Sequence, residues 1–143
     1  MPVPDHQLPV INRLISFIVV FMSIGTMAEL LLIGHYEDSW QLLPIILIAS
    51  SMVVFILIHW RKTALTGFFK TLMIACAISG LIGLWFHLNA NFEFEKEMYP
   101  THSFGTLLLK SLTGALPVLA PGSMIVFGSI GYLYVLLKQQ TFQ

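Results

Sequence analysis

Three histidines and two carboxylates are the residues of this chain whose side chains could together bind a metal ion. They are His35, His87, His102, Glu29 and Asp38. Imidazole and carboxylate groups together suit zinc, copper, iron or nickel. The sequence has no HExxH and no CxxC motif, so the spacing of these residues is not that of a known metal signature. A divalent transition-metal site therefore enters as a hypothesis that rests on residue type alone.

The same residues also have structural interpretations. His87 ends an apolar segment, where its imidazole could bond to a loop carbonyl instead of a metal. Glu29 lies inside an apolar run, where a carboxylate is costly in lipid. It could pair with Lys96 or Lys110, or it could be the site of a small proton-coupled transporter. A surface haem is a weaker alternative, because all five histidines lie at or beyond the ends of the apolar runs.

The composition of the chain defines its class. Of its 143 residues, 57% are hydrophobic and only 10% are charged, and the mean hydropathy is +0.84. Soluble domains carry about 25% charged residues, so this chain cannot cover a water-facing surface and requires a lipid bilayer. The net charge of zero argues against a nucleic-acid partner. Cys76 is the only cysteine, which excludes thiol–disulfide exchange, and the lack of a catalytic motif favours a non-enzymatic function.

The elements that would position these residues are helices. We predict an all-α, single-domain bundle with four transmembrane helices at about 14–33, 42–60, 68–88 and 118–138. Each has about the 20 apolar residues that a span needs. Residues 89–104 form a polar stretch that could be a short extended segment, because phenylalanine and glutamate alternate there, or could equally be irregular. Residues 104–116 predict an amphipathic helix that lies on the surface or re-enters the membrane, so that 89–116 would form an outer segment.

Charge separates between the two ends of these helices. Five basic residues share one side, namely Arg13, Arg61, Lys62, Lys70 and Lys138. Six carboxylates fall on the other side, namely Glu29, Glu37, Asp38, Glu93, Glu95 and Glu97. Basic residues favour the cytoplasmic side. We therefore expect both termini in the cytoplasm, and the loops 34–41 and 89–104 outside together with the three histidines of the hypothetical metal site.

Small residues on the third predicted span form a stripe. Cys76, Gly80, Gly83 and His87 follow steps of four, three and four residues, so they share one helix face. Small residues allow helices to approach closely in lipid, and we expect this face to meet the bundle, with His87 at its outer end. Further small residues favour homo- or hetero-oligomers, namely Ala75, Ser79, Gly122, Gly128 and Gly131.

Three segments carry a resemblance to other proteins. They are GHYEDSWQLLP after the first span, NFEFEKEMYP after the third, and LTGALPVLAPG before the fourth. In this combination the chain resembles small, uncharacterised four-helix proteins of the bacterial inner membrane. The resemblance implies an inner-membrane location, and it brings no activity, cofactor or functional residue. A second comparison is with the small multidrug resistance proteins, which also have four short helices and a carboxylate in the first, as Glu29 is here.

These observations favour a small integral membrane scaffold or accessory subunit. Its acidic outer face would contact a partner membrane protein, a second copy of the chain, or a cation. The alternative is an extracytoplasmic protein that binds a metal or a surface haem through the histidines and carboxylates named above. Proton-coupled transport through Glu29 is a third hypothesis, and it requires a path for water to that residue.

Overall fold

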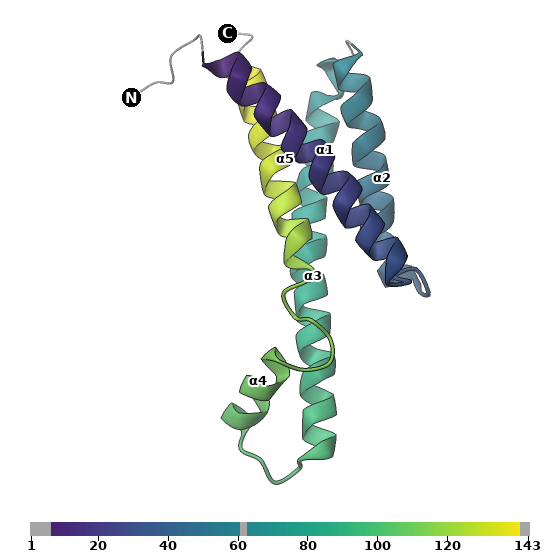
Figure 1. Cartoon of the computed structure of the whole chain (residues 1–143), viewed down its shortest axis with the longest axis vertical. Coiled ribbons are helices and arrows are strands. Elements are labelled where there is room, and N and C mark those ends of the chain that lie inside the picture. The colour runs from purple at the N-terminus through teal and green to yellow at the C-terminus, as the bar shows by residue number, and fades with distance from the viewer. Residues whose placement is uncertain (1–6, 61–62, 141–143) are drawn as a thin grey trace.

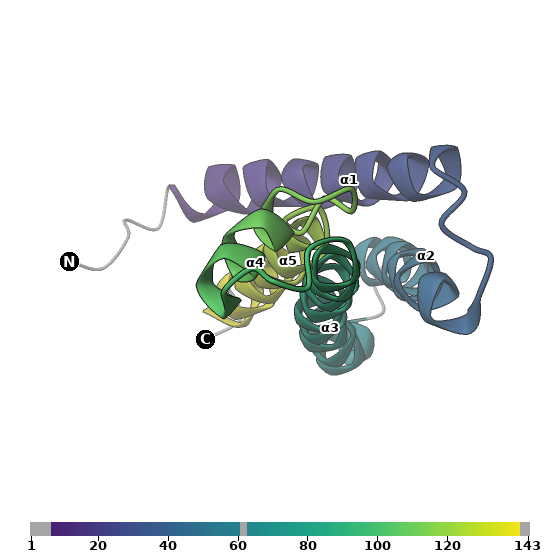
Figure 2. The ribbon, with the colours of Figure 1, turned by 90° about the horizontal axis from the view of Figure 1, so that it is seen from below.

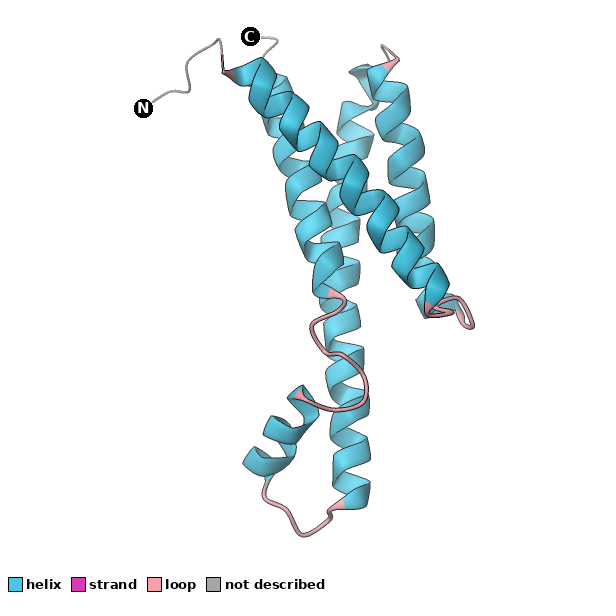
Figure 3. Cartoon of the chain, viewed as in Figure 1, coloured by secondary structure: helices cyan, strands magenta, loops and turns pink. Residues whose placement is uncertain are grey.

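The protein is all-α. The computed structural model describes residues 7–60 and 63–140. Within these ranges it contains helices joined by loops and no strand (Figure 1, Figure 3), which confirms the predicted class. The elements in chain order are α1 (Leu8–Leu32), α2 (Ser39–His59), the short 3-10 helix η1 (Thr63–Leu65), α3 (Thr66–Met98), α4 (Phe104–Leu112) and α5 (Gly122–Gln140).

Local sequence signals explain where the first two helices begin. α1 begins at Leu8, earlier than the predicted 14, with Pro9 in its first turn where the missing N–H costs little. α2 begins after Asp38, whose Oδ1 accepts hydrogen bonds from the backbone N–H groups of Trp40 and Gln41 at 2.8 and 2.9 Å. This is the usual role of an aspartate that precedes a helix. The boundaries of these two helices therefore follow from residues that lie next to them in the chain.

Within the described residues three helices, α1, α2 and α3, are long and apolar enough to cross a membrane, and not the four that were predicted. The predicted fourth span at 118–138 is realised as α5, which has 19 residues. It is shorter at its start because Pro117 and Pro121 bias the residues before them away from helix, and the helix begins at Gly122. It is also less apolar, since it contains three glycines, two tyrosines, a lysine and two glutamines.

α3 is one continuous helix of 33 residues, which corrects the predicted extended or irregular stretch at 89–104. No glycine or proline interrupts the chain from 84 to 99, so nothing stops the helix after its apolar part. The helix ends at Met98 because Pro100 disfavours a helical conformation at Tyr99. At about 1.5 Å per residue, α3 is about 50 Å long. It therefore exceeds the roughly 30 Å hydrocarbon core of a bilayer.

The helices form a bundle with a projecting end. α5 packs along α3 and also contacts α1, while α2 packs against α3 on another side (Figure 1, Figure 2). The described ends of the chain and the α2–α3 connection lie at one end of the bundle, and the α1–α2 loop lies at the other. Arg13, Lys70 and Lys138 therefore lie at the first end. Arg61 and Lys62, which we assigned to the same side, fall outside the described residues.

The small-residue stripe of α3 is used inside the chain. A Cβ atom added at Gly80 would lie 2.8 Å from the carbonyl oxygen of Pro121 and 2.9 Å from the backbone nitrogen of Ile125. A Cβ atom at Gly83 would lie 2.9 Å from Pro121 as well. The expected close contact between this stripe and the bundle is thus confirmed, and its partners are the first turn of α5 and Pro121, which precedes that helix. Because this contact within the chain already covers Gly80 and Gly83, these two glycines no longer support an oligomer.

Candidate functional site

The outer end of α3 and the helix α4 form a helical hairpin that projects from the bundle (Figure 1). We call residues 91–112 the outer hairpin and residues 113–121, which lead back to α5, the return loop. The ring of Trp40, at the start of α2, contacts that of Phe86 with centroids 5.4 Å apart, which marks the outer end of the bundle on α3. From Phe86 to Met98 the helix rises about 18 Å. The outer hairpin therefore extends well past the α1–α2 loop.

Asn91 holds the outer hairpin and the return loop together. Its side chain is only 3% exposed. Its Nδ2 donates hydrogen bonds to the carbonyl oxygens of Ser111 and Leu116 at 2.9 and 2.7 Å, and its Oδ1 accepts one from the N–H of Leu116 at 3.0 Å. A Cβ atom at Gly114 would lie 2.5 Å from the Asn91 amide, so a glycine is needed there. Asn91 was not among the predicted site residues, and Gly114 in the turn before Pro117 was the available signal for a tight approach.

α4 is the predicted amphipathic helix, shorter than the expected 104–116. It begins after Ser103, whose Oγ accepts a hydrogen bond from the N–H of Thr106 at 3.4 Å. Leu107 and Ser111 are buried against α3, and they lie four residues apart on one face of the helix. The helix packs along the projecting end of α3 and does not enter the bundle (Figure 1).

Charged and aromatic contacts also join the two helices of the outer hairpin. Lys110 lies 3.9 Å from a carboxylate oxygen of Glu95, and its Nζ lies 3.8 Å from the centroid of the Tyr99 ring. Tyr99 also stacks on His102, with centroids 4.9 Å apart and an angle of 7° between the rings. Lys96 pairs with Glu93 at 3.6 Å on α3 itself. The predicted pairing of Glu29 with Lys96 or Lys110 is therefore wrong, because both lysines pair with carboxylates of α3.

His87 bonds to the return loop. Its Nδ1 lies 3.0 Å from the carbonyl oxygen of Pro117. A carbonyl can only accept, so Nδ1 carries the proton and Nε2 keeps its lone pair when the ring is neutral. This contact confirms the structural interpretation in which His87 bonds a loop carbonyl. It also fixes the middle of the return loop against α3.

His35 of the α1–α2 loop lies within electrostatic reach of His87 and of Asp38. The pKa of His35 is lowered from its usual value, mainly by burial and next by the positive charge of a protonated His87, while Asp38 acts in the opposite direction. Asp38 has a second role, since its Oδ1 caps α2. His87 and Asp38 thus both act on the charge of His35, and both already serve the local structure.

His102 and Glu29 are the other two predicted metal-site residues. His102 stacks on Tyr99 beyond the end of α3, and its Nδ1 is buried without a hydrogen-bond partner. Glu29 is exposed near the end of α1. Within residues 7–60 and 63–140, no three His, Cys, Asp or Glu side chains come together in a way that could hold a metal ion. The five residues do not form one cluster, and metal binding at His35 and His87 stays a prediction.

The outward face of the outer hairpin is apolar. On α4, Leu109 and Leu112 lie on the side opposite the buried Leu107 and Ser111, and further large side chains of α4 and of the end of α3 are exposed beside them. These residues are Phe104, Leu108, Leu109 and Leu112 of α4, and Phe94 and Met98 of α3. Glu93 and Glu97 are also exposed on α3. The projecting part of the protein therefore combines apolar and acidic groups on its surface.

Comparison of the chain with protein-family models, with curated proteins and with solved structures finds no match.

Proposed function

We propose that the protein is a small accessory subunit of a membrane protein complex and that its partner binds to the outer hairpin. In this proposal α1, α2, α3 and α5 share one bilayer, the bacterial inner membrane, with both termini in the cytoplasm and the outer hairpin outside. The observation that carries the proposal is the exposed apolar face of α4, which lies beyond the end of the bundle. The partner would be another membrane protein with a complementary apolar surface outside the bilayer.

The length of α5 supports its place in the bilayer. Its 19 residues make a helix about 28 Å long, close to the roughly 30 Å of the hydrocarbon core. It packs against α3 and α1, which are both apolar enough to span. Contact with these helices shields part of its surface, so α5 needs less apolar character than a helix that lipid surrounds on its own.

The position of the outer hairpin supports a protein partner. The polar headgroup layer adds about 5–8 Å on each side of the hydrocarbon core. The hairpin extends about 18 Å past Phe86, which is further than this layer reaches. Leu109 is 69% exposed on α4, and Phe104 is equally exposed. A contiguous apolar face in water is unfavourable, and such faces commonly mark protein contacts.

Site-specific photocrosslinking tests this function. A photoreactive residue replaces Leu109 on the outer hairpin or, as the control, the 58%-exposed Val53 in the middle of α2. In native membranes we expect one discrete protein adduct from position 109 and none of that mass from position 53. The adduct should disappear in the Leu108→Asp variant, which changes an exposed residue of α4 and none of the bundle helices. The absence of a protein adduct at position 109, or the same adducts at both positions, would exclude the proposed docking.

Metal binding at the α1–α2 loop is the second candidate function. It is favoured by the free Nε2 of His87 and by the lowered pKa of His35, which keeps that imidazole neutral and able to bind a metal. Metal analysis of the purified protein tests it, with His102→Ala as the matched control. Binding predicts that His35→Ala loses the metal and that His102→Ala retains it. Equal metal content in the wild type and in His35→Ala would exclude the site.

A further inference from the structure

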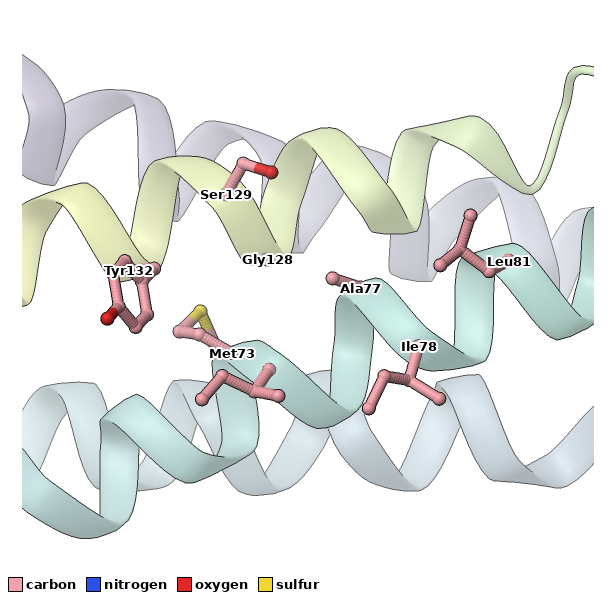
Figure 4. A pocket seen from close by; sticks show the side chains of 8 residues that line it. Met73, Ala77, Ile78, Leu81, Gly128, Ser129 and Tyr132 are labelled. Carbon is pink, nitrogen blue, oxygen red and sulfur yellow. The ribbon is translucent and has the colours of Figure 1, made fainter.

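A groove lies between α3 and α5 within the bundle (Figure 4). Its volume is about 300 Å³. The lining side chains are almost entirely apolar, and they are Met73, Ile74, Ala77, Ile78 and Leu81 of α3 with Gly128, Ser129 and Tyr132 of α5. From Met73 to Leu81 the α3 side of the groove is about 12 Å long. The groove is thus an elongated trough that runs along the two helices.

The trough exists because small residues line its floor. Gly128 lies against the backbone of α3, where an added Cβ atom would be 2.8 Å from the backbone nitrogen of Ala77. Neither residue has a side chain long enough to fill the space between the helices. Ile78 and Leu81, which are 50% and 58% exposed, form an open wall on α3. The trough therefore opens to the surroundings of the bundle.

One end of the trough carries a cation. Lys70 precedes Ile74 by four residues, so the two side chains lie on the same face of α3. The Nζ of Lys70 lies 5.2 Å from the centroid of the Tyr132 ring, which closes this end of the trough. In the described part of the chain the two ion pairs use Lys96 and Lys110, so Lys70 has no carboxylate partner there. Its charge remains available to an anion.

We propose that the trough binds one acyl chain of an anionic phospholipid, with the lipid phosphate at Lys70. α3 is apolar enough to span a membrane, so acyl chains are the apolar molecules that would meet the open wall of the trough. The hydroxyl of Ser129 donates to the carbonyl oxygen of Ile125 at 2.8 Å, which leaves it no proton for a polar ligand. Lysines at the ends of spanning helices reach toward the headgroups, and basic pockets between such helices bind anionic lipids. This inference does not depend on the role of the outer hairpin.

Native mass spectrometry of the purified full chain tests the proposal. The protein is mixed with equal amounts of phosphatidylglycerol and phosphatidylcholine, and the lipids retained per chain are counted. We expect the wild type to retain one phosphatidylglycerol in preference to phosphatidylcholine. Lys70→Gln should lower that preference about fivefold, the effect of one lysine at a membrane surface. Ser129→Phe should fill the trough and abolish retention of both lipids.

Two controls match these variants. Lys138→Gln removes a cation at the same end of the bundle, and Val53→Phe places a phenylalanine at an exposed position of α2. Both should retain phosphatidylglycerol as the wild type does. Equal retention by the wild type, Lys70→Gln and Ser129→Phe would overturn the proposal. A lipid-free dimer that Ser129→Phe dissociates would overturn it as well, because a helix of a second copy would then occupy the trough.

Fluorescence quenching gives a measurement that does not require the Ser129→Phe variant to fold. Trp85 lies four residues after Leu81 on the same face of α3 and is 63% exposed. With Trp40 and Trp60 replaced by phenylalanine, its emission reports on acyl chains near the outer end of the trough. Brominated phosphatidylglycerol should quench this emission more strongly than brominated phosphatidylcholine, and Lys70→Gln should remove the difference. Equal quenching by the two lipids in the parent protein would overturn the proposal.

Discussion

Replacing Asn91 with alanine should detach α4 and the return loop from α3 while the bundle stays folded. The variant loses three hydrogen bonds, to the carbonyl oxygens of Ser111 and Leu116 and to the N–H of Leu116. A protein hydrogen bond contributes about 1 kcal/mol net, and a buried group left without a partner costs about 1–3 kcal/mol. Water can reach the groups once the segment opens, so we take the lower value for each bond. The expected loss is therefore about 3 kcal/mol of local stability.

Hydrogen exchange followed by mass spectrometry measures this loss. A change of about 3 kcal/mol raises the opening equilibrium about 100-fold. Peptides that cover 104–116 should exchange faster by that factor in Asn91→Ala, and peptides from the middle of α2 should not change. Asn89→Ala is the matched control, since Asn89 is an exposed asparagine on the same helix. If both variants leave 104–116 equally protected, Asn91 does not hold the hairpin and the reasoning is refuted.

Two further predictions concern the bundle and its pH dependence. Gly80→Ala should lower the free energy of unfolding by about 1–3 kcal/mol, because the new methyl group meets the backbone of Pro121. Gly25→Ala, with open space around it, should not lower it, and equal loss in both variants would refute the close contact. For His35, the lowered folded-state pKa means that the unfolded chain binds more protons, so stability should fall as the pH decreases below about 6.5. Thermal unfolding from pH 8 to 5 should show a smaller decrease in His35→Gln than in His102→Gln, and identical profiles would contradict this.

The sequence was sufficient where a helix depends on its own residues and their immediate neighbours. The apolar runs at 14–33 and 42–60 correspond to α1 and α2, and the amphipathic pattern at 104–116 corresponds to α4. Separation of charge to the two ends of the bundle also follows from these runs, because a helix carries its charged ends to opposite sides. Such features need only the local chain and the preference of apolar residues for lipid.

The local sequence pattern gave a wrong prediction for the outer part of α3. The alternation of Phe92 and Phe94 with Glu93 and Glu95 suggested an extended segment, but the structure is helical there. Phe92 packs on Phe104 with centroids 5.5 Å apart, and Glu95 pairs with Lys110, so α4 stabilises this part of the helix. These partners are more than ten residues away in the chain, and a local pattern cannot reveal them.

The candidate sites show the same division. Residue types alone named His35, His87 and Asp38, and in the structure the charges of His87 and Asp38 act on His35 because the α1–α2 loop lies level with that end of the bundle. Residue types could not exclude His102 from the predicted metal site, although in the structure His102 lies on the outer hairpin and stacks on Tyr99. Nor could they reveal that Asn91 binds backbone groups 20 and 25 residues later in the chain.

The sequence by itself determined that this is a helical protein suited to a membrane, with basic groups at one end and acidic groups at the other. Its apolar content and helix-end signals act over a few residues, so they can be read without a fold. Only the tertiary structure decided that α3 extends beyond the other helices of the bundle, that Asn91 holds the outer hairpin, and that a trough lies beside Lys70. Those features arise where distant segments pack together, and the packing depends on shapes and hydrogen bonds that no local pattern contains.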